Sequence, residues 1–457
     1  MRRRSTACLL FVLATATATG AVAGAPSSAA VPAGSNGYAS FPAPGSAGEQ
    51  EGEPSLAANW KTGASLLQVG LHTYKVTWDA TGLPTWRDVS SRTTGLISLD
   101  PIAASDNATG RVFVSQLTAV GSLMAYSDND GESWTTTQGS GLPAGIDHQT
   151  VGAGPYPPEF SAPLGSTYSH AVYYCSQDLV TALCARSDDG GLTYGAGVPM
   201  YSLAECGGLH GHVRVSPDGT VLVPNRNCGQ GQGVIVSRDA GTTWRLSTIA
   251  GTTVGVSDPS VAGGKDGTLY VGLADGTGRA LAAVSRDKGS NWSAPVDVGA
   301  AYGVRNSAFA TVIAGDGDRA AMAFLGTKTP GNSQDPYFGM DPTHTRYLGA
   351  TWHLYIATTY DRGRTWSTVD ATPKDPVQRG RICLGGTGCS GMDRNLLDFM
   401  DIQADRSGRV LVGWPDGCIG TCVDSDTVAS NTYSSKGTIT RQTSGKGLFA
   451  TPPKLAD

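Results

Sequence analysis

An eight-residue pattern, Ser-x-Asp-x-Gly-x-Thr-Trp, recurs along the chain and constrains its fold more than any other feature. The intact copy begins at Ser237 and ends at Trp244, and close copies begin at Ser127, Ser187, Ser285 and Thr359. In such a segment the Asp or Asn side chain can accept hydrogen bonds from nearby backbone amides, glycine permits a positive φ, and the aromatic ring packs against its neighbours. We therefore interpret each copy as a hairpin turn with a structural role, and we assign none of its residues to catalysis.

A second repeat, an apolar strand opened by a polar residue, keeps register with the first. Its opening residues are Glu53, Asp100, His148, His210, Asp258 and Asn306, with a looser copy around Asp398. Three of the turns begin 27 residues after an opening residue, and four intervals between successive openings are 47 or 48 residues. This period suits four short strands per propeller blade. The sequence predicts an all-β fold, a single β-propeller of four-stranded blades. Seven blades are favoured, and six are the alternative if the first or last copy is not a separate blade.

The two ends of the chain predict export and a single folded domain. Residues 1–23, with three arginines before an apolar stretch and small residues, are typical of a signal peptide. Residues 24–48 are mostly Ala, Pro, Ser and Gly, a composition that predicts a disordered spacer. The propeller is placed at residues 49–457. No later segment approaches 18 consecutive apolar residues, so we expect a secreted, extracellular protein that does not enter the membrane.

The cysteines favour disulfides. Without Cys8 the chain has eight, an even number that suits an oxidising compartment. Neighbours in the sequence are the preferred pairs, because each would close a short surface loop: Cys175/Cys184, Cys206/Cys228, Cys383/Cys389 and Cys418/Cys422. A zinc site built from the last two pairs is the alternative.

The net charge of −5 shows no basic stripe, so nucleic acid is not an expected partner. We expect a monomer without a cofactor.

The repeated turns resemble the Asp-box, or BNR, repeats of the sialidase superfamily. The resemblance covers the propeller and implies its scaffold, since similar boxes occur in other glycosidases, in receptors and in non-enzymatic propellers. Sialidases carry an Arg-Ile-Pro motif at the start of an innermost strand, where this chain has Gly52-Glu53-Pro54 and no arginine. Arg394 resembles another carboxylate-binding arginine of the family, and Tyr433 resembles its nucleophilic tyrosine. The family pairs that tyrosine with a glutamate, for which we choose Glu205.

The strand openings also predict a site without the resemblance. Equivalent positions of innermost strands converge on the axis of a propeller, so the opening residues should form a ring at one mouth of the channel. Three of the seven histidines, His148, His210 and His212, fall on or beside this ring. For a glycosidase site, the candidate catalytic residues are Asp100, Glu205, Asp258 and Tyr433. The candidate substrate-binding residues are Glu53, His148, His210, Arg214, Arg305 and Arg394.

Three functions fit these residues. The first is a sialidase-like, exo-acting glycoside hydrolase whose partner is an extracellular glycan or glycoconjugate. The second is a non-catalytic propeller that binds glycan or protein, with polar residues lining a wet channel. The third is a metal-dependent hydrolase or lyase, because strand alternation puts His210 and His212 on one face and His148 could supply a third ligand.

Overall fold

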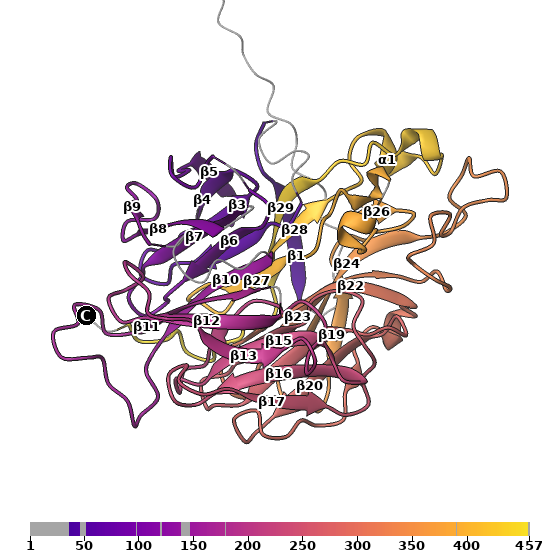
Figure 1. Ribbon diagram of the computed structural model, residues 1–457. Helices are drawn as coiled ribbons and strands as arrows, with labels where there is room; N and C mark the ends of the chain where they lie inside the picture. The colour runs from indigo at the N-terminus through magenta and orange to yellow at the C-terminus, as the bar shows by residue number, and fades with distance from the viewer. Residues whose placement is uncertain are drawn as a thin grey trace, which may run out of the picture.

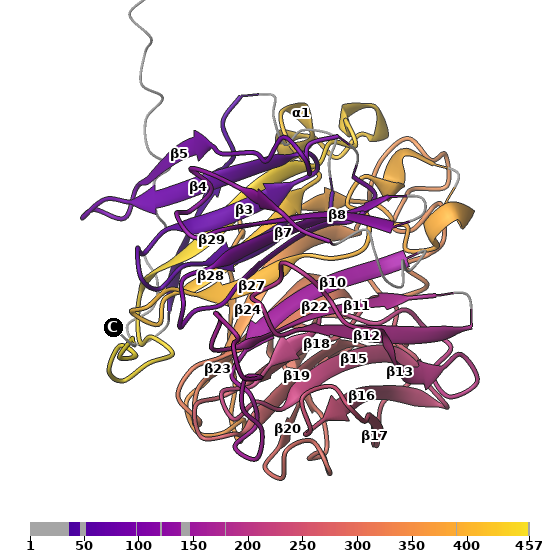
Figure 2. The ribbon, with the colours of Figure 1, turned by 60° about the vertical axis from the view of Figure 1, so that its left-hand side comes forward.

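The computed structural model describes residues 36–45, 52–96, 98–118, 121–138, 147–178, 180–389 and 391–455. The described strands form seven antiparallel sheets arranged in a ring (Figures 1 and 2). The innermost strands contact one another in chain order, and the innermost strand of the last sheet contacts that of the first. The fold is therefore a seven-bladed β-propeller, which confirms the all-β prediction and the favoured blade count.

Six blades are built from consecutive strands, named from the axis outward. Blade one is β2 (Ser55–Ala58), β3 (Ser65–Val69), β4 (His72–Trp78) and β5 (Pro84–Asp88). Blade two is β6 (Pro101–Ser105), β7 (Val112–Thr118), β8 (Gly121–Ser127) and β9 (Thr135–Thr136). Blade three is β10 (Asp147–Gly154), β11 (Ala171–Gln177), β12 (Thr181–Ser187) and β13 (Val198–Ser202). Blade four is β14 (Arg214–Val215), β15 (Val221–Cys228), β16 (Gly231–Ser237) and β17 (Arg245–Ile249). Blade five is β18 (Ser260–Gly263), β19 (Leu269–Ala274), β20 (Ala280–Ser285) and β21 (Val296–Asp297). Blade six is β22 (Asn306–Ala314), β23 (Ala320–Thr327), β24 (Thr351–Thr359) and β25 (Ser367–Asp370), with β26 (Gln378–Arg379) paired to β24.

The seventh blade joins the two ends of the described chain. Its strands from the axis outward are β27 (Asp401–Ala404), β28 (Val410–Asp416), β29 (Lys436–Ser444) and β1 (Gly37–Pro42). Helical structure in the described residues is limited to α1 (Thr421–Asp424) and the 3-10 turns η1 (Ala300–Tyr302), η2 (Gly386–Gly388), η3 (Met392–Arg394) and η4 (Val428–Ser430). None of the described helices is long and apolar enough to span a membrane.

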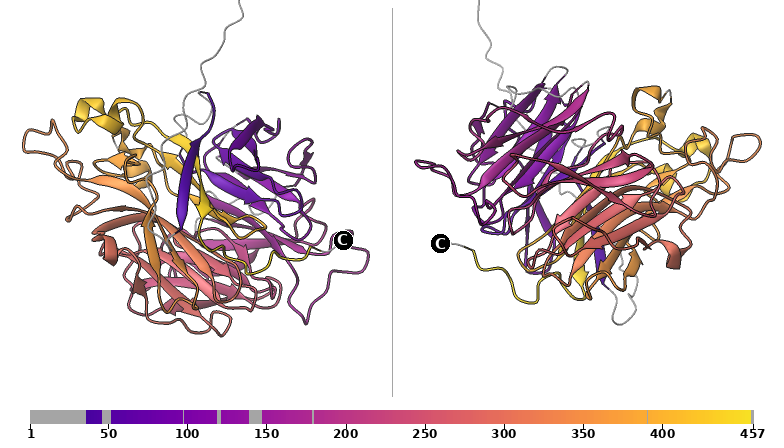
Figure 3. Two further views of the ribbon diagram at one scale, coloured as in Figure 1. Left: turned by 180° about the vertical axis from the view of Figure 1, so that it is seen from behind. Right: turned by 60° about the horizontal axis from the view of Figure 1, so that its bottom comes forward.

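Strand β1 corrects the predicted spacer. It pairs antiparallel with β29, with Phe41 opposite Ile439, and the Phe41 ring packs against Trp78 of the first blade at 5.5 Å. Seen from behind, the indigo β1 lies along the yellow strands of the last blade (Figure 3). Composition averaged over residues 24–48 hid a six-residue strand with two aromatic rings, so that prediction is wrong for Gly37–Pro42. The predicted signal peptide and the rest of the spacer up to residue 35 lie outside the described residues.

The repeated eight-residue turns all close in the same way. In the intact copy the Ser237 hydroxyl accepts from Gly241 N at 2.9 Å, and Asp239 Oδ1 accepts from Thr243 N at 2.8 Å. Gly241 has a φ of 79°, which favours glycine. The other four copies repeat the bond from the glycine amide to the first hydroxyl. All five join the third and fourth strands of blades two to six, at the outer edge of the ring, which supports a structural role.

Four disulfides confirm the preferred cysteine pairs: Cys175–Cys184, Cys206–Cys228, Cys383–Cys389 and Cys418–Cys422. The first links facing residues of β11 and β12, and the second links blade four to the loop before it. Because all eight of these thiols are oxidised, they cannot serve as thiolate ligands, and the alternative zinc site is wrong.

Candidate functional site

Five of the predicted opening residues line one mouth of the central channel, in a cavity of about 580 Å³. They are Glu53, Asp100, His148, Asp258 and Asp398, and Asp147, Arg226 and Arg394 lie beside them. Each comes from the start of an innermost strand or from a segment next to one. The ring geometry therefore brings together side chains that are up to 345 residues apart along the chain, such as Glu53 and Asp398.

His148 joins the two candidate catalytic aspartates. Its Nδ1 lies 2.9 Å from Asp258 Oδ2, and its backbone N donates to Asp100 Oδ2 at 3.2 Å. The residue has a φ of 48° at a register shift in β10, which turns the ring across the mouth toward blade five. With a histidine of standard dimensions, these contacts hold the two carboxyl groups within about 10 Å of each other. This upper bound includes the separations of glycosidase carboxyl pairs, about 5–9.5 Å.

Burial and charge push the pKa values of these carboxyl groups in opposite directions. Burial raises the pKa of Asp100 to about 6, against the opposing charge of His148. Burial also raises the pKa of Glu53 well above its usual range, and Asp100 and Asp398 raise it further. For Asp258, burial alone would raise the pKa, but the charge and hydrogen bond of His148 outweigh it and lower the pKa below the usual range. The mouth thus holds Asp100, which keeps its proton up to about pH 6, beside Asp258, which stays ionised.

Two carboxyl oxygens at this mouth have no hydrogen-bond partner in the described part of the chain. They are Asp258 Oδ1 and Glu53 Oε2, and both are buried. The other oxygen of each is occupied, since Asp258 Oδ2 pairs with His148 and Glu53 Oε1 accepts from Asp398 N at 3.0 Å. One oxygen of each group is therefore fixed by the protein, and the second has no protein partner among the described residues.

Sequence reasoning missed three parts of the mouth. Arg226, on β15, lies next to Asn225, which bridges to the opening residue His210. Asp147 directly precedes His148, and the loop of residues 384–387 is enclosed by the Cys383–Cys389 disulfide. The one signal available for Arg226 was that its neighbour Asn225 lies opposite the opening residue His210. The loop comes from an insertion that the repeat does not describe.

The structure does not bring Glu205, Tyr433 or Arg305 into this mouth. Glu205 is exposed in the loop after the outer strand β13, where its carboxylate accepts from Ser202 N at 2.9 Å. The Tyr433 hydroxyl bonds to the Tyr347 hydroxyl at 3.0 Å. Arg305 is exposed, and none of the three lines the cavity. The predicted tyrosine–glutamate pair is not formed at this mouth, because Glu205 lies at the outer end of the connection from β13 to β14 and the Tyr433 hydroxyl is bonded to Tyr347.

Two other opening residues are turned away from the mouth. The Asn306 amide donates to the carbonyl oxygens of Thr329 and Gly331, at 2.9 and 3.1 Å. His210 is 1% exposed, its Nδ1 lies 2.9 Å from Gly211 O, and it is absent from the cavity lining. Its carbonyl accepts from His148 Nδ1 at 3.1 Å, so it positions the His148 ring instead of contacting substrate.

Arg214 and His212 lie deeper in the channel. Arg214 begins β14, four residues after the opening residue His210. There it donates to Asp401 Oδ1 at 2.7 Å, and it lines a second cavity at the opposite mouth. His212 packs edge-on against Phe399 at 4.7 Å. Neither residue can bind the same ligand group as Asp100, which corrects the placement of Arg214.

The three histidines do not form a metal site. No group of three or more His, Cys, Asp or Glu side chains in the described part of the chain is arranged to hold a metal ion. The rings of His148 and His210 are 6.3 Å apart, and each Nδ1 already contacts a protein oxygen. The metal-dependent alternative with His148, His210 and His212 is therefore set aside.

Acid destabilisation provides a test of His210 burial. Burial lowers the pKa of His210 from 6.5 to about 4, so the folded state resists its protonation. This histidine stabilises the fold fully above pH 6.5, and that contribution is lost as the pH falls toward 4, by about 3 kcal/mol. We expect the free energy of unfolding of His210→Asn, relative to that of the unsubstituted protein, to rise by about 3 kcal/mol between pH 7 and pH 4. Denaturant unfolding at the two pH values measures this change. A difference that does not change with pH would contradict the assignment.

Comparisons with known proteins show that the chain is similar in fold to several solved structures. No protein-family model matches the chain, and no curated protein matches it. Among solved structures it is similar to a protein of unknown function from Dyadobacter fermentans DSM 18053, at 13% identity and a TM-score of 0.44, covering 90% of this chain and 100% of that one. It is also similar to the Hadza microbial sialidase Hz136 (16%, TM-score 0.37, 86% of this chain and 65% of that one). A third similar structure is an Aleuria aurantia lectin bound to α-methyl-L-fucoside (11%, TM-score 0.42, 69% and 94%). At these sequence identities and TM-scores, the similarities support no conclusion about activity.

Proposed function

We propose that the protein is a secreted glycoside hydrolase that cleaves extracellular glycans at the mouth formed by the strand openings. The observation that carries the proposal is the pair of carboxyl groups, Asp100 and Asp258, which share His148 as a neighbour and have pKa values displaced in opposite directions. Glycosidases need one carboxyl group that keeps a proton and a second that is ionised. Asp100 is the general acid, and Asp258 is the base or nucleophile.

The chemistry follows from the free oxygens. Protonated Asp100 donates its proton to the glycosidic oxygen as the bond to the leaving group breaks. Ionised Asp258 uses its unpartnered Oδ1 to attack the anomeric carbon or to activate a water, while His148 holds Oδ2 and keeps the group charged. Glu53, whose pKa is raised, acts as a neutral hydrogen-bonding group for a sugar hydroxyl.

The charge of the mouth indicates the substrate class. Five carboxyl groups line it, from Glu53, Asp100, Asp147, Asp258 and Asp398, against the guanidinium groups of Arg226 and Arg394 and the imidazole of His148. Arg394 already binds Asp398 through both of its terminal nitrogens. Glu53 occupies the position of the first sialidase arginine, and a carboxyl group there opposes the carboxylate of a sialoside. We therefore propose a glycoside without a carboxylate as the substrate.

Export and family membership are part of the same proposal. The turn geometry supports Asp-box repeats and a place in the sialidase superfamily. Four disulfides are consistent with an oxidising compartment, as expected if residues 1–23 are a signal peptide. We propose that the folded domain begins at β1 and continues to the end of the chain as one propeller.

A panel of aryl glycosides tests the activity. The purified chain without residues 1–35 is incubated with neutral and N-acetylated hexosides, a sialoside and a uronide, and release of the aryl group is measured. We expect turnover of at least one uncharged glycoside and none of the sialoside. Glu205→Gln is the matched control, because this exposed carboxyl group lies outside the mouth. Saturable glycan binding without turnover of any substrate would instead favour the non-catalytic propeller.

The pH profile of that turnover is a second test. An acid catalyst works only while protonated, so kcat/KM should fall above pH about 6 as Asp100 ionises. The pKa of Asp258 is lowered, so this group stays ionised in acid and should cause no decline of activity until below the ordinary pKa of an aspartate, about 3.9. Steady-state rates between pH 3.5 and 9 check this expectation. A rate that rises through pH 6 to a plateau would show that the group titrating there acts as a base.

A further inference from the structure

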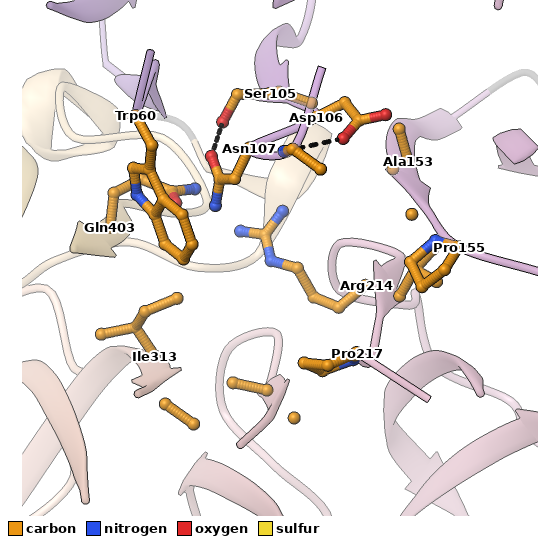
Figure 4. A pocket seen from close by; sticks show the side chains of 18 of the residues that line it. Trp60, Ser105, Asp106, Asn107, Ala153, Pro155, Arg214, Pro217, Ile313 and Gln403 are labelled. Carbon is orange, nitrogen blue, oxygen red and sulfur yellow. Dashed lines mark hydrogen bonds between the residues drawn. The ribbon is translucent and has the colours of Figure 1, made fainter. Parts of the chain in front are cut away.

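A second cavity, of about 420 Å³, opens at the opposite mouth of the channel. It is formed where the innermost strands end, and none of the carboxyl groups of the first mouth lines it. Trp60, Asn107, Arg214, Ile313 and Gln403 surround it, with the Arg214 guanidinium directed toward Asn107 across its middle (Figure 4). A volume of this size is in the range of small-ligand sites.

Three side chains in this cavity carry unused hydrogen-bonding groups. Gln403 is only 7% exposed, and its carboxamide has no hydrogen-bond partner among the described residues. Figure 4 shows this carboxamide directed into the cavity. Arg214 uses Nη2 for Asp401, so Nε and Nη1 are without partners in the described part of the chain. Asn107 accepts from the Ser105 hydroxyl at 3.0 Å through Oδ1, which leaves its NH₂ group free.

Cationic side chains supply hydrogen-bond donors to this cavity. Arg214 and Lys265 bring positive charge to the lining, and Asp106 is the one carboxyl group among its described residues. Asp106 is engaged by the Tyr168 hydroxyl at 2.7 Å and by His170 Nδ1 at 2.8 Å. Asp401, the partner of Arg214, is fully buried behind the cavity and does not line it. A guanidinium with free N–H groups beside an amide donor suits a carboxylate.

The rest of the wall is apolar and rigid. The Trp60 indole is fixed by a hydrogen bond from Nε1 to Ala404 O at 2.8 Å and by the Phe449 ring at 5.3 Å. Ile313, Pro155 and Pro217 complete the wall (Figure 4). A flat indole suits the apolar face of a sugar ring, while Gln403 offers both a donor and an acceptor to hydroxyl groups.

We propose that this cavity is a binding site for a carboxylate-bearing monosaccharide unit, such as a uronic acid residue of a glycan. The carboxylate binds Arg214 and Asn107, the ring stacks on Trp60, and a hydroxyl group bonds to Gln403. The site is separate from the first mouth and holds an acidic sugar, whereas that mouth is lined by carboxyl groups. Ligand binding at this second cavity does not depend on catalysis at the first mouth.

Titration calorimetry with methyl β-D-glucuronoside and the matched neutral methyl β-D-glucoside tests the proposal. We expect at least tenfold tighter binding of the uronide, which weakens as salt is added. Asn107→Asp, which places a carboxylate beside Arg214, should weaken uronide binding at least tenfold, and Gln403→Leu several-fold. Asp100→Asn, at the first mouth, should leave it unchanged. Asn107 is half-buried and outside the strands, so its variant tests the site without disturbing the buried pair of Arg214 and Asp401.

Several outcomes would overturn the proposal. They are equal affinity for the two glycosides, no saturable binding of the uronide, or tighter binding of benzoate, an aromatic acid without hydroxyl groups. Uronide binding that is lost in Asp100→Asn and retained in Asn107→Asp would place the ligand at the first mouth instead. All of these are read from binding, so they are distinct from failure of the turnover assay.

Discussion

Asp258→Asn is expected to lower kcat/KM for a hydrolysed glycoside by about 10²–10⁴-fold, the usual contribution of a positioned acid–base group. Asparagine keeps the size of the side chain and can still accept from His148, but it has no negative charge to stabilise or attack the anomeric centre. Asp100→Asn should cause a loss of similar size on substrates with poor leaving groups. The measurement is steady-state hydrolysis by both variants, with thermal unfolding recorded to confirm that they fold.

Leaving-group dependence separates the two roles. A dinitrophenyl glycoside departs without protonation, so it should restore much of the activity of Asp100→Asn and little of that of Asp258→Asn. Glu205→Gln should match the unsubstituted protein on every substrate, because Glu205 is exposed and bonds only within its own loop. Equal rescue of both aspartate variants would contradict the assignment of acid and base.

The blade architecture could be predicted because its cause is local and repeated. Each turn needs a hydroxyl, a carboxyl or amide, a glycine and an aromatic ring within eight residues, and these letters recur at the blade spacing. Strand β1 could not be found in this way. Its partner is β29, about 400 residues further along the chain, and a single strand of six residues carries no repeat of its own.

The ring of opening residues could also be predicted, because closure of the propeller brings equivalent positions to one mouth. Five openings lie there, while Asn306 and His210 show that a position in the repeat does not fix the direction of a side chain. The prediction of Tyr433 rests on a short resemblance, and that of Glu205 rests only on the need for a glutamate partner. Neither residue belongs to a strand opening, so the repeat does not predict its distance from the axis. Arg214 comes only four residues after the opening residue His210, yet it lines the cavity at the other end of the channel.

Removal of β1 is expected to have the largest effect on stability. A chain that begins at residue 49, the boundary expected from composition, lacks the outer strand of the last blade and the contact between Phe41 and Trp78. Strand β29 then becomes an open edge along Thr438–Ser444. The loss of a whole strand ladder is comparable with the stability of a domain, about 5–15 kcal/mol. We expect the shorter chain to be unfolded or aggregated in circular dichroism and sedimentation measurements.

A chain that begins at Asn36 is the matched control, and it should fold as the longer chain does. A synthetic peptide of residues 36–45, added during refolding, should restore soluble protein by pairing with the open edge of β29, since a free strand can supply main-chain hydrogen bonds in trans. The same peptide with Phe41 replaced by serine should be less effective, because it pairs without filling the space beside Trp78. Equal melting temperatures for the chain from residue 49 and the control would contradict this prediction. That result would show that the propeller is stable without the pairing of β1 with β29.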